Sequence, residues 1–411
     1  MSMDRRGFLK TSLLGCSAAA SPFLTPVSFA AAPWDARLVV IILRGAMDGL
    51  DAVQPWGAPE YAGYRPGMPR PGDASGPLDL GGFYAMHGAL APLKPMWDKG
   101  ELGFVQAVST PYRNKRSHFD GQDILEAGAM VNGQPVRDGW LNRMLQGVPG
   151  IEADTAYAVG RSDMLLMRGD APVANWAPGS DIGGWSAQGM RLLEQVMHDD
   201  PLFRDALDEA ELLSDADQAD QDPETMTGGM MNMTEMSAPA KKAAPTGGHR
   251  AIARYAGERL RGDSRIAAFS LNGWDTHAGQ KAALSRALGR LSDVIEDLKS
   301  STGPVVWGKT AVVVMTEFGR TVRLNGTRGT DHGTGGAMIL AGGALRGGRV
   351  AGKWPGLGEA ELYNRRDLMP TADVREYAAW MMRDLFGLSR GALEGTIFPG
   401  LEMSANPKLI L

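Results

Sequence analysis

The feature that most limits what this sequence can fold into is a set of short apolar runs, most of them bounded by glycine. The five runs are RLVVIILRG (37–45), LGFVQAVS (102–109), RIAAFSLNG (265–273), TAVVVMTEFG (310–319) and GAMILAGG (336–343). Strands that are apolar on both sides belong to sheets covered by helices on both faces, and such sheets are mainly parallel. The runs therefore predict an α/β fold with a largely parallel central sheet.

Helical patterns lie between these runs. Segment 283–300 places leucine or isoleucine on one helical stripe, at positions 284, 288, 291, 295 and 298. A second helix is expected from Thr371, which follows Pro370 and could act as its N-cap, to a stop at Gly387. Strands that alternate with helices are typical of an α/β domain.

The N-terminus is typical of a targeting segment, which does not belong to the fold. MDRRGFLKTSLLG (3–15) has paired arginines at Arg5 and Arg6 before an apolar stretch and resembles a twin-arginine export signal. Small residues allow cleavage after Ala30 or Ala32. We therefore expect a signal peptide over 1–32, a single domain over 33–411, and a periplasmic or secreted protein handled by the twin-arginine export machinery. That machinery moves folded cargo, which favours a cofactor or metal loaded before export.

The cysteine content, the apolar runs and the net charge limit the disulfides, membrane segments and partners that this protein can have. Cys16 is the single cysteine, so a chain cleaved after it has no disulfide. LLGC (13–16) is also similar to a lipoprotein cleavage box, and lipidation of Cys16 stays open as an alternative. No other run reaches the roughly 18 apolar residues of a membrane helix, so no transmembrane segment is predicted in the mature protein. A net charge of −5 gives no reason to expect nucleic acid as a partner.

One segment differs in composition from the rest of the chain. From about 214 to 248 the sequence is acidic, then rich in methionine, then rich in alanine, proline and lysine, which predicts a disordered insertion or a surface lid. Four methionines cluster in it, at positions 230, 231, 233 and 236. Thioethers suit Cu(I), so copper handling is one interpretation and a low-complexity linker is the other.

Acids and histidines follow several of the predicted strands. In open α/β sheets the carboxyl ends of the strands meet where ligands bind. The residues concerned are Asp48 and Asp51 after the first run, Asp275 and His277 after the third, Glu317 and Arg320 after the fourth, and Asp331 and His332 before the last. Each could have a local role instead, as a turn, a helix cap or an internal ion pair. Together they predict a site for a divalent metal, with Zn²⁺, Mn²⁺, Mg²⁺ and Ca²⁺ all compatible with the donors.

Five motifs carry a resemblance to a known family. They are LRGAMDGLDAVQPWG, SHFDGQDILEAG, GWDTH, TEFGRT and DHGTGGAMILAGG, within residues 37–388. The chain is identified by them as a member of the domain of unknown function family 1501, within the alkaline-phosphatase-like superfamily of alkaline phosphatases, sulfatases and cofactor-independent phosphoglycerate mutases. The resemblance implies a three-layer sandwich with helices on both faces of the sheet.

The resemblance also implies roles for single residues. Asp48 would bind the metal beside the nucleophile, and Asp275, His277 and His332 would bind a second metal. Glu317 stands where the superfamily has an Asp-His pair, and Phe318 replaces the histidine. The site could therefore hold one ion or two. Asp331 is an alternative ligand.

The nucleophile of the superfamily lies at the start of a helix, where backbone N–H groups help to bind an anion. Ser117 matches that position after Arg113, Lys115 and Arg116, with a simple N-cap as the alternative. His118 would be a ligand or a general acid, and Arg320, with Arg323 and Arg328, would bind the anionic group. The predicted function is an exported metal-dependent hydrolase of phosphate or sulfate monoesters, with an anionic ester as substrate. The alternative is a catalytically degenerate binding or assembly protein that keeps the fold.

Overall fold

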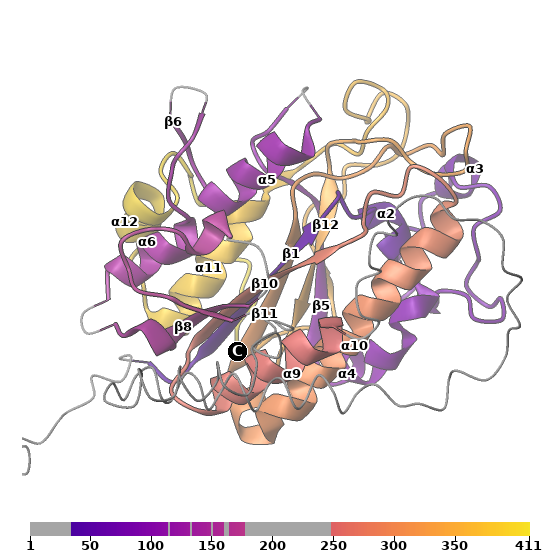
Figure 1. Cartoon of the computed structure of the whole chain (residues 1–411). Coiled ribbons are helices and arrows are strands. Elements are labelled where there is room, and N and C mark those ends of the chain that lie inside the picture. Colours follow the sequence, from indigo (N-terminus) through magenta and orange to yellow (C-terminus); the bar gives the residue numbers. More distant parts are fainter. Residues whose placement is uncertain (1–33, 114–115, 132–133, 149–150, 160–163, 177–247) are drawn as a thin grey trace, which may run out of the picture.

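A nine-stranded sheet forms the centre of the computed structural model, which describes residues 34–113, 116–131, 134–148, 151–159, 164–176 and 248–411 (Figure 1). Its strands are β1 (Arg37–Arg44), β5 (Leu102–Ser109), β8 (Ala156–Val159), β9 (Ala174–Trp176), β10 (Ile266–Asn272), β11 (Thr310–Thr316), β12 (Gly336–Ala341), β13 (Val350–Ala351) and β14 (Ala372–Asp373). They lie in the order β13-β5-β12-β11-β1-β10-β8-β9, and β14 also pairs with β5. The five apolar runs of the sequence are β1, β5, β10, β11 and β12.

All neighbouring pairs of this sheet are parallel except the two pairs made by β12. That strand lies between β11 and β5 and runs antiparallel to both. The predicted largely parallel sheet is therefore confirmed, with one reversed strand. Because β12 is reversed, the residues that precede it lie at the same edge as the residues that follow β11.

The three central strands also end level with one another. Leu43 of β1 pairs with Leu271 of β10 on one side and with Thr316 of β11 on the other. The three loops that follow these strands therefore begin side by side.

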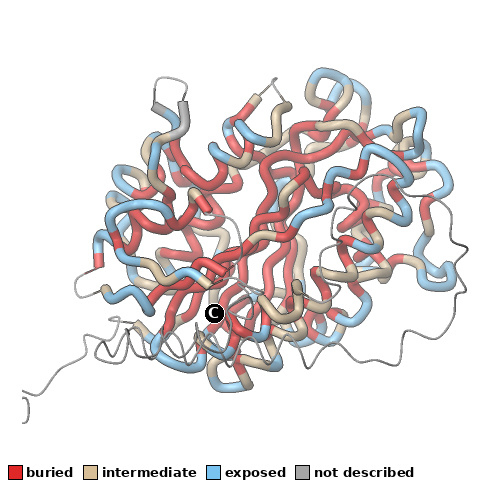
Figure 2. The backbone as a smooth tube through the Cα atoms, in the orientation of Figure 1, coloured by how far each residue is buried: buried red, intermediate tan, exposed pale blue. Residues whose placement is uncertain are grey.

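Alternate residues of β1 pack into two different cores. Leu38, Val40 and Ile42 contact one core, and Val39, Ile41 and Leu43 contact the other. This follows from the two-residue repeat of a strand. Burial of each such side chain stabilises the fold by about 1.5–3 kcal/mol. Figure 2 shows the central strands as an almost continuous buried region.

Helices cover both faces of the sheet, which confirms the predicted three layers (Figure 1). The first face carries α5 (His118–Ala127), α6 (Trp140–Gln146), α11 (Val374–Phe386) and η6 (Leu393–Ile397). The second carries η1 (Gly88–Leu93), α4 (Lys94–Asp98), α9 (Gly248–Arg261) and α10 (Gln280–Trp307). The remaining elements are α2 (Gly49–Ala52), α3 (Tyr61–Tyr64), η2 (Ala153–Thr155), η3 (Leu165–Met167), α12 (Arg390–Ala392) and the short strands β2 (Val53–Gln54), β3 (Leu78–Asp79), β4 (Ala85–Met86), β6 (Met130–Val131) and β7 (Gln134–Pro135).

The two expected helices are present, and one of them has a different start. The predicted stripe of α10 is buried along its length. In α11 the N-cap is Asp373, whose side chain accepts from Arg375 N, and Gly387 ends the helix in the left-handed conformation. The expected cap at Thr371 was wrong because residues 372–373 pair with β5, which holds Thr371 outside the helix. Its hydroxyl donates to Lys353 O instead.

Several expectations fall on residues outside the described ranges. These are the signal segment 1–32 with Cys16 and the insertion up to residue 247, since α9 begins at Gly248.

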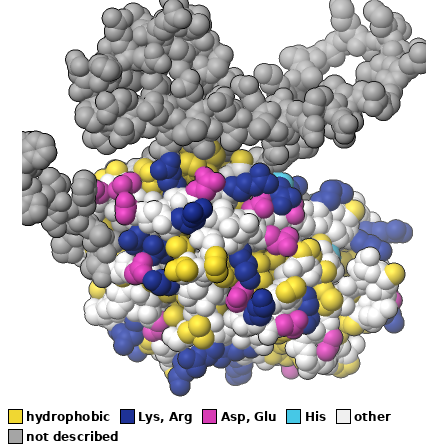
Figure 3. Space-filling view, turned by 90° about the horizontal axis from the view of Figure 1, so that it is seen from below, with side chains coloured by type: hydrophobic (Ala, Val, Ile, Leu, Met, Phe, Trp, Pro, Cys, Tyr) yellow, Lys and Arg dark blue, Asp and Glu magenta, His cyan; other side chains and the backbone are white. Residues whose placement is uncertain are grey.

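Among the described helices, none has the length and apolar character needed to cross a membrane. On the face shown in Figure 3, cationic and anionic side chains are interspersed.

Candidate metal centre

The candidate site lies at the edge where β1, β10 and β11 end. Asp275 and His277 follow β10, Glu317 follows β11 directly, and His332 precedes the reversed strand β12. His118 is the first residue of α5, which follows β5 in the chain. Four separate segments of the chain therefore contribute to one place.

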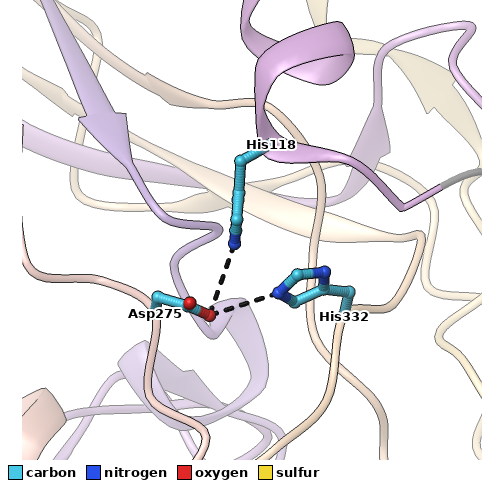
Figure 4. Close-up of side chains that lie close together, drawn as sticks. All are labelled: His118, Asp275 and His332. Carbon is cyan, nitrogen blue, oxygen red and sulfur yellow. Dashed lines mark hydrogen bonds and ion pairs between the residues drawn. The ribbon is translucent and has the colours of Figure 1, made fainter.

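Asp275 Oδ1 is the centre of this group. His277 Nε2 lies 3.1 Å from it, His332 Nε2 3.2 Å and His118 Nε2 3.4 Å. Figure 4 shows the imidazoles of His118 and His332 pointing at this carboxylate from different elements. His118, Asp275 and His332 have ligand atoms close enough together to hold one metal ion, and His277 lies next to two of them.

The other nitrogen of each imidazole faces a hydrogen-bond acceptor. Nδ1 of His118 lies 2.8 Å from Glu317 Oε1, and Nδ1 of His332 lies 2.8 Å from Arg116 O. Nδ1 of His277 lies 3.3 Å from Asp331 Oδ1. A neutral imidazole that donates from Nδ1 has its lone pair on Nε2. In that tautomer all three lone pairs are directed at the centre of the cluster.

This donor set fits a bound cation. His277 Nε2 and His332 Nε2 lie 2.9 Å apart. When both rings carry their proton on Nδ1, the two facing lone pairs repel unless a positive charge lies between them. His118 Nε2 is buried and makes no hydrogen bond. Four ligands at about 2.0–2.1 Å around zinc lie about 3.3–3.4 Å from one another, close to the spacings found here. Imidazole nitrogens with a carboxylate oxygen also suit Mn²⁺ and other divalent ions.

Glu317 lies behind His118, with no exposed surface. Its Oε1 accepts from Gly45 N, Gln122 Nε2 and His118, and its Oε2 accepts from Thr316 Oγ1. Burial alone would raise the pKa of Glu317, but these hydrogen bonds, led by that of His118, lower it overall. The hydrogen bond to Glu317 in turn raises the pKa of His118. Glu317, expected as a ligand, thus lies behind His118, and an acceptor in this position orients an imidazole and makes its other nitrogen more basic.

Arg320 lies buried beneath the centre. Its guanidinium donates to Ala46 O, Gly45 O, Trp274 O and Thr330 O, and to Asp275 Oδ1 at 2.5 Å. Burial raises the pKa of Asp275, but the hydrogen bond and charge of Arg320 lower it overall. With these hydrogen bonds, Arg320 holds the loops after β1 and β10 in place. Its contact with substrate stays a prediction.

Two further groups of the site, His332 and Asp331, have shifted pKa values. Burial lowers the pKa of His332, and the hydrogen bond from Asn325 lowers that of Asp331. Asp331 was expected as an alternative ligand and lies behind His277. Asp275 is 46% exposed, so the centre is open to solvent. The side chains of Glu317 and Arg320 are buried.

Asp48 is placed elsewhere. One of its oxygens accepts from Arg65 and from Gln280, each at 2.7 Å, and the other caps α2. Asp51 shares both partners and also accepts from Tyr61. Asp48 is therefore paired with a buried arginine and does not join the histidine cluster.

Ser117 is the N-cap of α5, where its Oγ accepts from Asp120 N at 3.4 Å. Its own backbone N–H donates to Tyr112 Oη. Phe318, at the position where the superfamily has a histidine, stacks on the ring of His118 at 5.2 Å. Ser117 is thus adjacent in sequence to a residue of the cluster, and its hydroxyl proton has no acceptor among the described residues.

Glycines allow the loop between β11 and β12 to approach its own start. Gly319 N donates to Thr334 O, and Gly333 N donates to Gly319 O. A Cβ on Gly319 would lie 1.9 Å from Gly335 O. The close backbone contact between Gly319 and residues 333–335 therefore requires glycine.

The sequence did not indicate several residues that support the centre. Gln122 donates to Glu317, and Gln280 donates to Asp48. Arg65 donates to Val322 O and Thr321 O in the loop between β11 and β12. Gln122 does follow His118 by four residues, one helical turn, which is a weak local signal. Arg65 and Gln280 have none, because their partners are distant in the chain.

Comparison with known proteins adds a family and a set of distant structures. A family model described as "Protein of unknown function (DUF1501)" matches residues 107–378, more than half of the chain. No curated protein matches it.

Three solved structures are similar at low identity. The lipoteichoic acid synthase LtaP from Listeria monocytogenes has 9% identity and a TM-score of 0.41, over 94% of this chain and 78% of that one. The C-terminal periplasmic domain of EcEptC from Escherichia coli has 12% identity and a TM-score of 0.38, over 91% and 92%. A protein in the alkaline phosphatase superfamily from Vibrio parahaemolyticus has 11% identity and a TM-score of 0.37, over 93% and 76%. At this level of similarity they carry no argument about the site.

Proposed function

The chain belongs to DUF1501, a family of unknown function, and we propose from the geometry of its site that the protein is a metal-dependent hydrolase of phosphate or sulfate monoesters. One observation carries this proposal. Three imidazoles, each held through Nδ1 by an acceptor, direct Nε2 at one carboxylate oxygen that is open to solvent. Side chains that only stabilise a fold have no need for facing lone pairs of this kind.

His118, Asp275, His332 and His277 would hold the ion, and we expect one ion because Asp48 is paired with Arg65. When bound, a divalent ion supplies a Lewis acid for the oxygens of the ester and lowers the pKa of a bound water. Glu317, Asp331 and Arg116 O would keep the three imidazoles in one tautomer. Zn²⁺ fits the donor set best, and Mn²⁺ is the next choice.

Two arginines beside His332 favour an anionic substrate. Arg366 Nη1 donates to His332 O and to Asp367, and Arg116 lies 3.6 Å from the same carboxylate. Two guanidinium groups that share one carboxylate carry a net positive charge. Their side chains are 34% and 36% exposed, so they can reach an anionic group, which supports a phosphate or sulfate ester.

Ser117 remains our candidate for the nucleophile. Its Oγ would form the bond to phosphorus or sulfur as the bond to the ester oxygen breaks, and the serine proton would end on the departing alcohol. Water would then hydrolyse the seryl ester and restore the hydroxyl. Ser117→Asn separates this role from capping, because asparagine caps helices as well as serine does. We expect loss of turnover with unchanged thermal stability. Full turnover in Ser117→Asn would exclude Ser117 and leave water as the nucleophile.

The experiment that tests the proposal combines metal content with turnover. The mature protein, purified without chelator, should contain about one equivalent of divalent metal and hydrolyse p-nitrophenyl phosphate or sulfate. Asp275→Asn and His332→Ala should lose both, whereas His249→Ala, which changes a surface histidine paired with Asp293, should keep both. A wild-type protein without metal would refute the proposal.

The alternative is a catalytically degenerate binding protein with the same centre. The cap role of Ser117 and the burial of Arg320, whose guanidinium donates to five oxygens of the protein, favour it. Metal without turnover, over a broad set of phosphate and sulfate esters, would favour this alternative.

Location outside the cytoplasm is part of the proposal and rests on Arg5 and Arg6 of the sequence. Export should fail in the variant Arg5→Lys/Arg6→Lys, since the twin-arginine address is read by a receptor. Fractionation of cells that carry the tagged full chain would measure this. Equal export of the variant would contradict the twin-arginine route.

A further inference from the structure

A cavity lies beside the first turns of α10, apart from the histidine cluster. Its volume is about 720 Å³, within the range of small-molecule sites. It is lined by residues of the segment 67–77, by 87–89, and by Lys281 and Ser285 of α10. None of the residues of the candidate metal centre lines it.

His87 presents one N–H group at this cavity. Its Nδ1 accepts from Ala89 N at 3.0 Å, so the proton of the neutral ring is on Nε2. Burial lowers the pKa of His87 to about 4, which keeps the ring neutral at pH 7. Nε2 lies 3.5 Å from Ser285 Oγ, a long contact, and the Ser285 hydroxyl itself donates to Lys281 O. The N–H of His87 is thus free for a better acceptor.

Gln54 lies behind the wall of the cavity. Its Oε1 accepts from Trp56 Nε1 at 2.6 Å, and because an indole nitrogen only donates, the amide orientation is fixed. The Nε2 group has no partner among the described residues. Gln54 has no exposed surface, so this group is not in contact with the cavity itself.

The charged groups of the lining are unequal. Arg70 and Lys281 are both exposed, and neither forms an ion pair with any of the described residues. Asp73 is the one carboxylate in the lining, and its Oδ2 accepts from Arg70 N at 2.8 Å. Two cations against one anion give the cavity a net positive charge.

We infer that this cavity binds a small oxyanion, such as a phosphate, sulfate or carboxylate group. Lys281 and Arg70 supply the charge, and His87 Nε2 supplies a neutral donor. Its occupation does not require the metal centre, so the inference stands or falls apart from the proposed hydrolase activity.

The test is calorimetric titration of the mature protein with inorganic phosphate, in a His332→Ala background that removes phosphate binding at the metal centre. We expect one site, weakened about tenfold or more by Lys281→Ala, as for loss of a charged hydrogen bond. Arg286→Ala removes the same charge from the same helix outside the cavity and should leave binding unchanged.

A second variant tests the neutral donor. His87→Asn keeps an acceptor for Ala89 N and removes the N–H from the cavity, so it should also weaken binding. Succinate and sulfate, titrated separately, distinguish a carboxylate from a tetrahedral anion. Absence of a site in the His332→Ala protein, or equal affinity in Lys281→Ala and Arg286→Ala, would overturn the inference.

Discussion

His118 Nδ1 lies 2.8 Å from Glu317 Oε1, although 199 positions separate the two residues in the sequence. The hydrogen bond places a buried carboxylate behind an imidazole whose Nε2 faces Asp275. Such a pairing fixes the tautomer of a ligand and raises its basicity. It links the end of β11 to the start of α5, and so joins the sheet to the helix that carries Ser117.

The first prediction concerns this pair. Glu317→Gln keeps the acceptor for His118 and can donate to Thr316 Oγ1, but removes the charge, so metal affinity should fall about 10–100-fold with the fold intact. Competition with a chromophoric chelator measures the affinity. Glu359→Gln, at an exposed glutamate, is the control and should equal the wild type. Equal affinity in Glu317→Gln would exclude the proposed orienting role.

The second prediction concerns the glycines of the loop between β11 and β12. Gly319→Ala puts a Cβ against Gly335 O and should lower the free energy of unfolding by about 1–3 kcal/mol, as overpacking does. Gly326→Ala, where a Cβ meets nothing within 4 Å, should change it by less than about 0.5 kcal/mol. Chemical denaturation of both variants gives the comparison. Similar values for the two would show that the loop relaxes around Gly319.

The third prediction concerns Arg65, which is buried between Asp48 and Asp51. Arg65→Met leaves two carboxylates without their cation and should destabilise the protein by about 3–5 kcal/mol. Arg286→Met, at an exposed arginine of α10, should have almost no effect. Thermal melts followed by circular dichroism would show the difference. A small effect in Arg65→Met would mean that one carboxyl becomes protonated at little cost, which fits the direction of the shift in Asp51, whose pKa is raised by burial.

The fourth prediction concerns pH. The pKa of His87 falls from 6.5 to about 4 in the folded state because the ring is buried. Between these values the unfolded chain binds the proton and the folded chain does not. Stability is therefore complete above pH 6.5 and decreases as the pH falls towards 4, by about 3 kcal/mol from this group.

His87→Asn should remove that part of the pH dependence, measured as the free energy of unfolding at pH 7 and at pH 4.5. The control His249→Asn changes a histidine at the surface and should keep the full slope. Identical slopes in wild type and His87→Asn would contradict the assignment.

Much of the fold could be predicted because each central strand is a continuous apolar run. The run at 336–343 gave the position of β12, but an apolar run carries no direction, so its antiparallel orientation was not predictable. The start of α11 was misplaced because Thr371 and Asp373 are both good caps, and pairing with β5 decides between them.

The candidate site was predictable at the level of segments. Asp275, His277 and His332 were expected to meet because they lie next to strand ends, and the structure brings them together with His118. Which acids would point at the centre was not predictable. That choice depends on side-chain direction, and it places Glu317 and Asp331 behind histidines and turns Asp48 towards Arg65.

The reversed strand β12 also limits the order in which the chain can assemble. Strands β8, β10, β1 and β11 can pair without it, but β5 and the segment leading to α5 join the sheet only through β12. His118 and His332 therefore both reach their places only when β12, which comes late in the sequence, pairs with β11. Asp275 and His277 follow β10 and can be in place earlier, so the four side chains of the cluster come together only when β12 docks. The proposed ion would therefore find its complete set of ligands only at this late step of folding.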